Sequence, residues 1–459
     1  MTRKRNNTFK LLTSIAIVAV MSFSLLIAAL ADEYPFYSEG SSADNPAKAA
    51  ITKVFKVPVN TKVPQSTFTF TFDKVGVNGK TDKADMPGIP DISIGIAASA
   101  TSFPHPTEPG TWLVIKESGD FLKNPTAPVW EKVGIHKYTV TEVQSGIVFF
   151  NNGGKEEEYY SKAEYEIDIW VDRDSNGNLY AKYVYGIIVP GTETVDEWYE
   201  GYDPNKPKVD PTPGTSTSLE YDTINGKFSQ VVFTNKYWKT DGGGTTDPTK
   251  GALEISKTVD GLRDESELLG DVYFTFEVIV TQPSVVKDPQ TYNAYIFDSS
   301  GNKVTDAKNY GSYGADGLIT VASGSPLTVK LTDGQKLVFV DLHVGSKVEV
   351  WEVKDPANDD FTPTYLRSFA GDKTAKTGDY QDARWGFPRA TGDPADPGPH
   401  YLEEKPNHNK VDFTNTRTGS TPTGLDVNDL PYFLLIGVAA AGLVGYVALK
   451  YRRRAKRGV

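Results

Sequence analysis

The 459-residue chain has no cysteine, only 3 methionines and 5 histidines. Without cysteine, disulfides and thiol catalysis are excluded. The histidines are scattered and form no HExxH pattern, and P-loop and GxSxG motifs are absent, so these classes of turnover enzyme are not indicated. We therefore expect neither a metal site nor a cofactor. The histidines are His105, His136, His343, His400 and His408.

The chain also lacks an excess of positive charge. Its formal net charge is −11, and each end carries more basic than acidic residues, which leaves the part between them still more acidic. An acidic surface repels the phosphate backbone, which argues against nucleic-acid binding.

Both ends resemble targeting segments. The basic stretch TRKRNNTFK precedes an apolar run that ends in Ala29-Leu30-Ala31, which predicts a signal peptide over residues 1–31 with cleavage before Asp32. Near the other end, the uncharged run Tyr432–Leu449 is followed by the basic tail KYRRRAKRGV, which predicts a membrane span with its basic flank inside. The part between is then exported, and without disulfides it needs a large core or another cross-link.

The composition favours β-sheet with many turns. The chain has 41 Gly, 29 Pro and 24 Tyr, together with many short alternating runs. The part between the two ends contains one plan twice, each copy closing on FTN. Two tandem β-sandwich domains are therefore predicted. The expected divisions are a polar lead (32–47), the first domain (48–239), a Gly/Thr/Pro linker (240–250), the second domain (251–417) and a C-terminal tail (418–459).

Three loops are expected within the first copy. DRDSNGN, at Asp172–Asn178, resembles the first half of an EF-hand, but its twelfth position is Tyr183 instead of a glutamate, so an Asn-Gly hairpin turn is predicted. The Pro-rich stretch DPNKPKVDPTPGTSTS predicts a long loop, and GGKEEEYY predicts a solvated one.

Strand alternation places one lysine, one glutamate and one asparagine on the apolar face of each copy. Residues two apart share a face of a strand. By this count Lys53, Glu142 and Asn235 align with apolar neighbours in the first copy. The corresponding residues of the second copy are Lys257, Glu352 and Asn415. Since a lone buried charge is costly, each copy should bring its three residues together.

Burial of these residues suggests a reaction. Desolvation lowers a lysine pKa and raises a glutamate pKa, so a neutral amine can attack the asparagine amide carbon while a protonated glutamate polarises the carbonyl and moves protons. The product is a Lys–Asn isopeptide bond between the first and last strands, with release of ammonia. The alternative is an ordinary strand end with Lys and Glu pointing outward. Two triplets in the same order favour the cross-link.

The order ITK…FTFTF…YTVTEV…VVFTN, and in the second copy ISK…YFTFEV…VEVWEV…VDFTN, resembles the streptococcal pilin isopeptide-linkage domains. Two such domains between a signal peptide and a sorting signal look like a Gram-positive major, or backbone, pilin. The resemblance covers roughly residues 48–430 and implies immunoglobulin-like sandwiches. It also implies self-formed bonds Lys53–Asn235, assisted by Glu142, and Lys257–Asn415, assisted by Glu352.

The stretch before the apolar run resembles a sortase sorting signal, with Thr421 where the common LPxTG pattern has leucine. Its residues are Ser420, Thr421, Pro422, Thr423 and Gly424. The resemblance implies that a pilus-type sortase cleaves between Thr423 and Gly424 and joins Thr423 to a lysine of the next subunit. In the resembled pilins that lysine lies shortly before the last strand of the first domain, which implies Lys227 here. Lys206 and Lys208 are alternatives, because no YPK motif is present.

The expected function is that of a structural pilin subunit anchored to the Gram-positive cell wall, which supports adhesion and is not an enzyme beyond a single self-cross-linking turnover. Its expected partners are a sortase, other copies of itself, accessory pilins, peptidoglycan and a host receptor. The alternatives are an accessory or tip adhesin, attached singly to the wall, and a wall-anchored carbohydrate- or matrix-binding protein. High-mass ladders that collapse on Lys227→Ala would separate the backbone pilin from these alternatives.

Overall fold

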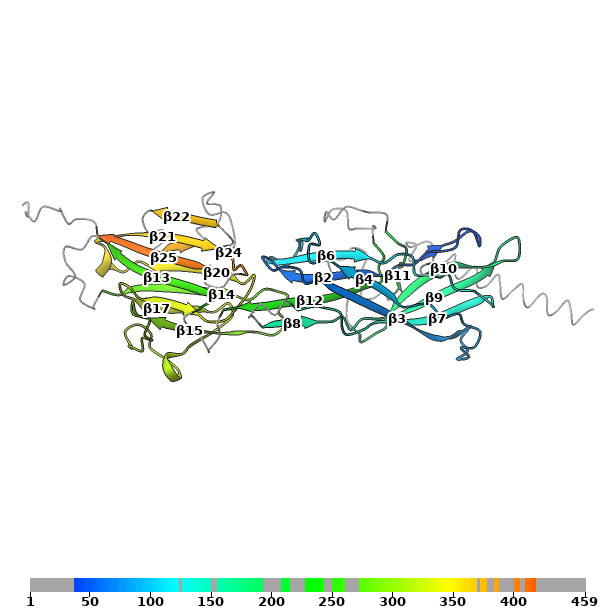
Figure 1. Ribbon diagram of the computed structural model, residues 1–459, viewed down its shortest axis with the longest axis horizontal. Coiled ribbons are helices and arrows are strands. Elements are labelled where there is room, and N and C mark those ends of the chain that lie inside the picture. The colour runs from blue at the N-terminus through cyan, green and yellow to red at the C-terminus, as the bar shows by residue number, and fades with distance from the viewer. Residues whose placement is uncertain are drawn as a thin grey trace, which may run out of the picture.

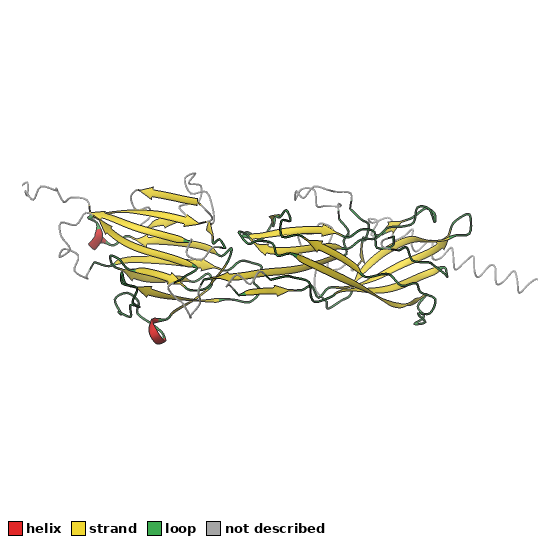
Figure 2. Cartoon of the chain, viewed as in Figure 1, coloured by secondary structure: helices red, strands yellow, loops and turns green. Residues whose placement is uncertain are grey.

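Two β-sandwiches lie end to end along the long axis of the molecule (Figure 1, Figure 2). The computed structural model describes residues 37–123, 126–149, 155–192, 208–214, 228–242, 250–260, 272–369, 372–377, 384–387, 400–404 and 409–417. Within these ranges, helix is limited to two 3-10 turns, Ala315–Gly317 and Pro356–Asn358. The prediction of an all-β chain with two tandem sandwiches is confirmed.

The N-terminal sandwich consists of two sheets that share one apolar core. One sheet has the order β1 (Ser38–Glu39), β10 (Leu179–Ile188), β9 (Glu164–Arg173), β7 (Gly134–Glu142), β3 (Ser66–Val77) and β4 (Ile92–Ile96), with β11 (Lys208–Val209) on β10. The facing sheet has the order β12 (Val232–Asp241), β2 (Thr52–Pro58), β6 (Thr111–Glu117) and β5 (Phe103–Pro104), with β8 (Glu156–Tyr159) on β12.

The C-terminal sandwich repeats this plan around a second core. One sheet has the order β16 (Ile319–Ala322), β15 (Thr291–Phe297), β18 (Lys336–Phe339), β13 (Leu253–Asp260), β25 (Lys410–Arg417), β21 (Phe361–Phe369) and β22 (Asp372–Thr377). The facing sheet has the order β17 (Pro326–Leu331), β14 (Phe274–Thr281), β20 (Lys347–Val353) and β23 (Arg384–Phe387), with β24 (His400–Tyr401) on β20.

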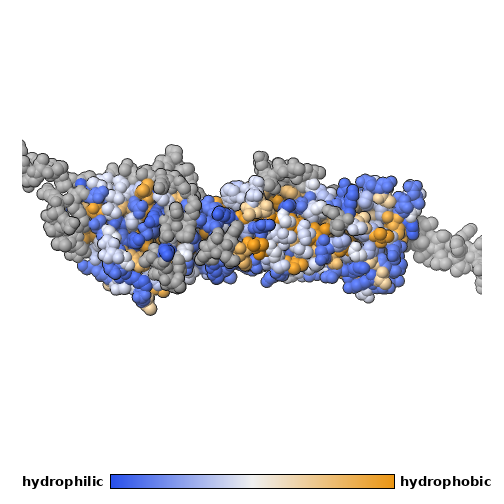
Figure 3. Space-filling model, in the orientation of Figure 1, coloured by the Kyte–Doolittle hydropathy of each residue, from blue (hydrophilic) through white to orange (hydrophobic). Residues whose placement is uncertain are grey.

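Strand alternation buries the aromatic residues of both copies. In β3 the phenylalanines Phe68 and Phe70 are fully buried, while the threonines that alternate with them are exposed or half-buried. The corresponding β14 buries Phe274 and Phe276 in the same way. On the face shown in Figure 3, apolar residues are interspersed among polar ones on both sandwiches. The apolar side chains of these strands therefore form the two cores, which supply the burial that a disulfide-free chain needs.

Two of the three predicted loops contain short strands in the structure. The turn between β9 and β10 is a hairpin as predicted, because the Asp174 carboxylate accepts the backbone N–H groups of Asn176 and Asn178. GGKEEEYY was wrongly expected to be a loop: Glu156–Tyr159 forms β8, which pairs with β12. Within the Pro-rich stretch, the pair Lys208–Val209 forms β11. Both added strands are short and depend on a long partner strand, which local sequence does not reveal.

Strand β12 joins the two sandwiches. After pairing with β2 and β8 it continues to Thr240 and Asp241, which pair with β19 (Leu342–His343) of the second copy. The expected linker at 240–250 therefore begins inside a strand, and residues 243–249 lie outside the described ranges. A continuous strand is stiffer than a Gly/Thr-rich coil, so it limits bending at the junction.

Side chains reinforce this junction. The buried Lys239 of β12 forms an ion pair with Glu404, which belongs to the second copy and is itself mostly buried. Asn60, in the turn after β2, donates through Nδ2 to the backbone carbonyl of Tyr401 at 3.1 Å. The two sandwiches are thus held by backbone pairing, an ion pair and a hydrogen bond at one joint.

Candidate cross-link sites

In each sandwich the first and last core strands are parallel neighbours. β2 pairs with β12 so that Lys53 is opposite Phe233 and Asn235 is opposite Phe55. Since residues two apart share a face, Lys53 and Asn235 point to the same side of the sheet. β13 and β25 repeat the arrangement, with Lys257 opposite Phe413 and Val259 opposite Asn415. In both copies the asparagine lies two positions further along the strand pair than the lysine.

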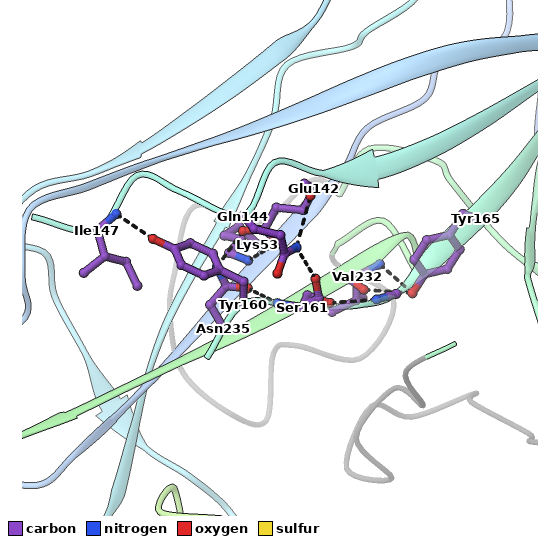
Figure 4. Close-up of polar contacts among 10 residues, drawn as sticks. Lys53, Glu142, Gln144, Ile147, Tyr160, Ser161, Tyr165, Val232 and Asn235 are labelled. Atoms are coloured by element: carbon purple, nitrogen blue, oxygen red, sulfur yellow. Dashed lines mark hydrogen bonds and ion pairs between the residues drawn. The ribbon is translucent and has the colours of Figure 1, made fainter. Parts of the chain in front are cut away.

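The structure brings the three predicted residues of the first copy together (Figure 4). Lys53 Nζ lies 2.6 Å from Oε2 of Glu142, which comes from β7 in the facing sheet. Asn235 Nδ2 donates to Oε1 of the same carboxylate at 2.5 Å. Lys53 and Asn235 are 0% exposed and Glu142 is 6% exposed. One carboxylate therefore holds an amine and an amide side by side away from water.

The three predicted residues of the second copy are arranged in the same way. Lys257 Nζ lies 3.0 Å from Oε2 of Glu352, which comes from β20 in the facing sheet. Asn415 Nδ2 donates to Oε1 of Glu352 at 2.7 Å. All three side chains are buried. Two sites built by different parts of the chain thus share one geometry.

The amine of each lysine lies over an aromatic ring. Lys53 Nζ lies 4.5 Å from the ring centroid of Phe68, and Lys257 Nζ lies 3.9 Å from that of Phe274, the residue at the equivalent place in β14. Burial lowers the pKa of Lys257 to about 8, although the neighbouring Glu352 carboxylate acts in the opposite direction. An amine with this pKa has a substantial neutral fraction near pH 8, and the neutral amine is the nucleophilic form.

The orientation of the Asn235 amide is determined by a second hydrogen bond. The backbone N–H of Ser161 donates to Asn235 Oδ1 at 2.8 Å (Figure 4). Because an N–H needs an acceptor, the amide oxygen faces Ser161 and the amide nitrogen faces Glu142. The expectation that the glutamate polarises the carbonyl oxygen therefore does not describe this site, where Glu142 contacts the nitrogen that would leave.

The second copy has no equivalent donor among the residues that the structure describes. Asn415 Oδ1 is buried there without a hydrogen-bond partner, while its Nδ2 contacts Glu352. Sequence reasoning did not find Ser161, and no sequence signal marks it, because its contribution comes from the backbone.

Several predicted residues lie outside the described ranges. They are the signal peptide (1–31), the apolar run Tyr432–Leu449, the polymerisation candidates Lys206 and Lys227, and the sorting motif with Ser420, Thr421, Pro422, Thr423 and Gly424. The third candidate, Lys208, is exposed at the start of β11, and its Nζ lies 5.1 Å from the ring centroid of Tyr185. Over the described part of the chain, no helix has the length and apolarity needed to cross a membrane.

Comparison with known proteins gives two kinds of match. Residues 251–387 match a family described as a domain of unknown function (DUF7601), a segment that contains Lys257 and Glu352 but ends before Asn415. No curated protein matches the chain. Among solved structures, the major pilin from Streptococcus pyogenes is 16% identical with a TM-score of 0.27, and the match covers 82% of this chain and 100% of that one.

The chain is similar to streptococcal major pilins. A second match, the major pilin protein (T-13) from Streptococcus pyogenes, is 17% identical with a TM-score of 0.26 and covers 84% of this chain and 100% of that one. The full-length major pilin SpaD from Corynebacterium diphtheriae matches at 12% identity and a TM-score of 0.12, over 81% of this chain and 98% of that one.

Proposed function

We propose that this protein is a structural cell-surface pilin subunit whose two domains each close an intramolecular Lys–Asn isopeptide bond. The bonds are Lys53–Asn235, assisted by Glu142, and Lys257–Asn415, assisted by Glu352. The observation that carries the proposal is the duplicate buried triad, in which one carboxylate contacts both the lysine amine and the asparagine amide in each domain.

The reaction needs no group beyond these side chains. The neutral Lys53 Nζ attacks Cγ of Asn235, a new C–N bond forms and the carbonyl electrons move to Oδ1. Glu142 takes a proton from the attacking nitrogen and delivers one to Nδ2, and the intermediate collapses with loss of ammonia. An amine and a primary amide become a secondary amide and ammonia, so atoms and charge balance. The protein is its own substrate, and a single turnover completes the reaction.

Energetics favour this product over a permanent ion pair. A buried ion pair carries a large desolvation cost that its Coulomb attraction repays only in part. Formation of the amide removes the lysine's charge from the core and allows Glu142 to take up a proton.

The bond also links β2 to β12 covalently, as its counterpart links β13 to β25. Each domain of a fibre subunit under tension needs such a connection between its first and last core strands.

The proposal also includes covalent polymerisation by a sortase. A sortase would cleave between Thr423 and Gly424 and transfer the Thr423 carboxyl to Lys227 of the next subunit, with Lys206 or Lys208 as alternatives. The finished polymer would then be attached to peptidoglycan, together with accessory pilins, and would present its surface to a host receptor.

Intact mass tests the cross-links directly. Residues 32–417, which contain every residue that the structure describes, should weigh about 34 Da less than their sequence mass, because two ammonias are lost. Glu142→Ala and Glu352→Ala should each restore about 17 Da, and peptide mapping should recover the Lys53–Asn235 and Lys257–Asn415 linkages separately. An unmodified mass in the folded wild-type protein would overturn the proposal and leave two ordinary buried ion pairs.

A further inference from the structure

The Ser161 N–H has the position of an oxyanion donor. It lies 2.8 Å from Asn235 Oδ1, the atom that gains negative charge when the lysine attacks. Backbone donors about 2.7–3.1 Å from the position that the oxyanion will occupy stabilise the tetrahedral intermediate of acyl transfer, and the Ser161 N–H already points at the oxygen that becomes this oxyanion. Ser161 is 1% exposed, so water does not compete with this donor.

Gln144 holds Ser161 in this position. Its side-chain Nε2 donates to the backbone carbonyl of Ser161 at 2.9 Å and to that of Glu142 at 3.1 Å (Figure 4). Both acceptors are carbonyls, so the Gln144 amide must present its NH₂ group to them. The residue thus ties the end of β7, which carries the carboxylate, to the loop that carries the oxyanion donor.

A second anchor fixes the same loop from its other side. The hydroxyl of Tyr160, the residue before Ser161, accepts the backbone N–H of Ile147 at 3.1 Å. Within the loop, Ser161 Oγ accepts the backbone N–H of Ala163 at 3.3 Å. The peptide that points at Asn235 is therefore held by contacts on both sides, as a preorganised donor requires.

We propose that the Ser161 N–H is the oxyanion donor of the first cross-linking reaction, that Gln144 is its positioning residue, and that the first site therefore reacts faster than the second. The inference rests on the proposed function. At Asn235, the Ser161 N–H stabilises negative charge on Oδ1, while Glu142 delivers a proton to the leaving nitrogen Nδ2. At the second site, Glu352 performs proton transfer without this help from any described residue.

The experiment follows both bonds in one chain. Uncross-linked residues 32–417, isolated in denaturant and checked by mass, are refolded by dilution, quenched in acid at set times and mapped for each linkage. In wild type, the Lys53–Asn235 linkage should form before the Lys257–Asn415 linkage. Gln144→Ala should slow the first by about tenfold or more, since loss of an oxyanion donor costs about 10²–10³ in rate and a displaced donor costs part of that. The second linkage is the internal control.

A matched control variant is available in the second sandwich. Gln282 likewise donates through Nε2 to two backbone carbonyls, those of Val286 at 2.9 Å and Asp288 at 3.0 Å, but it is not part of either triad. Gln282→Ala should leave the rate of the first linkage unchanged. Because Gln144 lies at the surface, its own replacement should not disturb the core.

Two further variants separate positioning from simple support of the fold. Gln144→Glu keeps the shape but loses the donor while ionised, so the ratio of first to second rates should be low at neutral pH and recover as the pH falls and the carboxyl regains a proton. Replacing the Ser161 N–H by an ester oxygen, through the α-hydroxy acid analogue of serine, removes the donor alone and should slow the first linkage at least as much as Gln144→Ala.

The outcomes are distinguishable. If wild type loses no ammonia, the proposed function fails. If wild type loses two ammonias but the ester variant closes the first linkage at the wild-type rate, the proposed function stands and this inference is overturned. An unchanged rate in Gln144→Ala together with a slow ester variant would support the Ser161 N–H as the oxyanion donor and would overturn the positioning role of Gln144.

Discussion

The two triads have the same lysine, glutamate and asparagine on equivalent strands, yet their carbonyl environments differ. Glu142 is opposite Phe70 in the first sandwich, and Glu352 is opposite Phe276, its equivalent, in the second. The rings of Phe70 and Phe233 lie 4.8 Å apart, and those of Phe276 and Phe413 lie 5.1 Å apart. Only the first amide oxygen has a donor among the described residues, Ser161. A repeated core can therefore carry two differently assisted reactions.

The largest expected effect comes from removing one bond at a time. Glu142→Ala should lower the melting temperature of the first sandwich, and Glu352→Ala that of the second, by roughly 10–20 °C each. A covalent link across a loop of more than 100 residues contributes about 5 kcal/mol if it acts as a disulfide does, and each variant also leaves a buried lysine charge without its carboxylate.

Differential scanning calorimetry with the mass of each sample measures this effect. Wild type provides the reference, and in each variant the transition of the untouched sandwich should stay within a few degrees. A variant that has lost its linkage but melts with wild type would mean that the bond does not stabilise the folded domain.

A milder substitution should reveal the difference between the sites. Glu142→Gln removes proton transfer at the first site but leaves the Ser161 donor on Asn235 Oδ1, whereas Glu352→Gln leaves Asn415 Oδ1 without help from a described residue. We expect the first site to close at a residual rate about 100 to 1,000 times that of the second, because one oxyanion donor contributes about 10²–10³ in rate. Timed mass measurements over days would show equal residual rates if the donor had no role.

The smallest expected effect is on pH dependence. Because burial lowers the pKa of Lys257 to about 8, the amine becomes nucleophilic as the pH rises through that value. The rate of the Lys257–Asn415 linkage should rise about tenfold per pH unit below 8 and level off above it. Refolding at pH 6 to 9, with acid quenching and peptide mapping, measures the profile. A flat profile below pH 8 would contradict attack by the neutral amine.

Sequence predicted the members of each triad because strand alternation is a local property. Lys53, Lys257 and their partners alternate in phase with apolar residues, and this pattern by itself predicts that they are buried. The contacts of Glu142 and Glu352 then follow from the cost of isolated buried charges. The two-sandwich fold could be predicted from the sequence for the same reason, because its strands have their own alternating pattern of apolar and polar residues.

Sequence could not predict the features that depend on loops and on partner strands. The contribution of Ser161 is a backbone N–H, which every residue except proline has, so its side chain marks nothing. Gln144 reaches the backbone carbonyl of Ser161 only because β7 ends beside that loop in space, which the local sequence does not show. Strand β8, in the acidic GGKEEEYY stretch, is stabilised by β12, with Glu157 accepting from the indole N–H of Trp238 at 3.2 Å.

The parallel pairing of β2 with β12, and of β13 with β25, has a further consequence. When the first and last strands of a domain run the same way, the chain enters at one end of the strand pair and leaves at the other, so a pull on both ends slides the strands lengthwise. The asparagine already lies two residues ahead of the lysine in the direction of that pull, about 7 Å at a rise of about 3.3 Å per residue, so the bond leaves little room for further sliding. Each cross-linked domain would then respond to tension as a nearly inextensible link, and in the proposed fibre length would be added only by adding subunits.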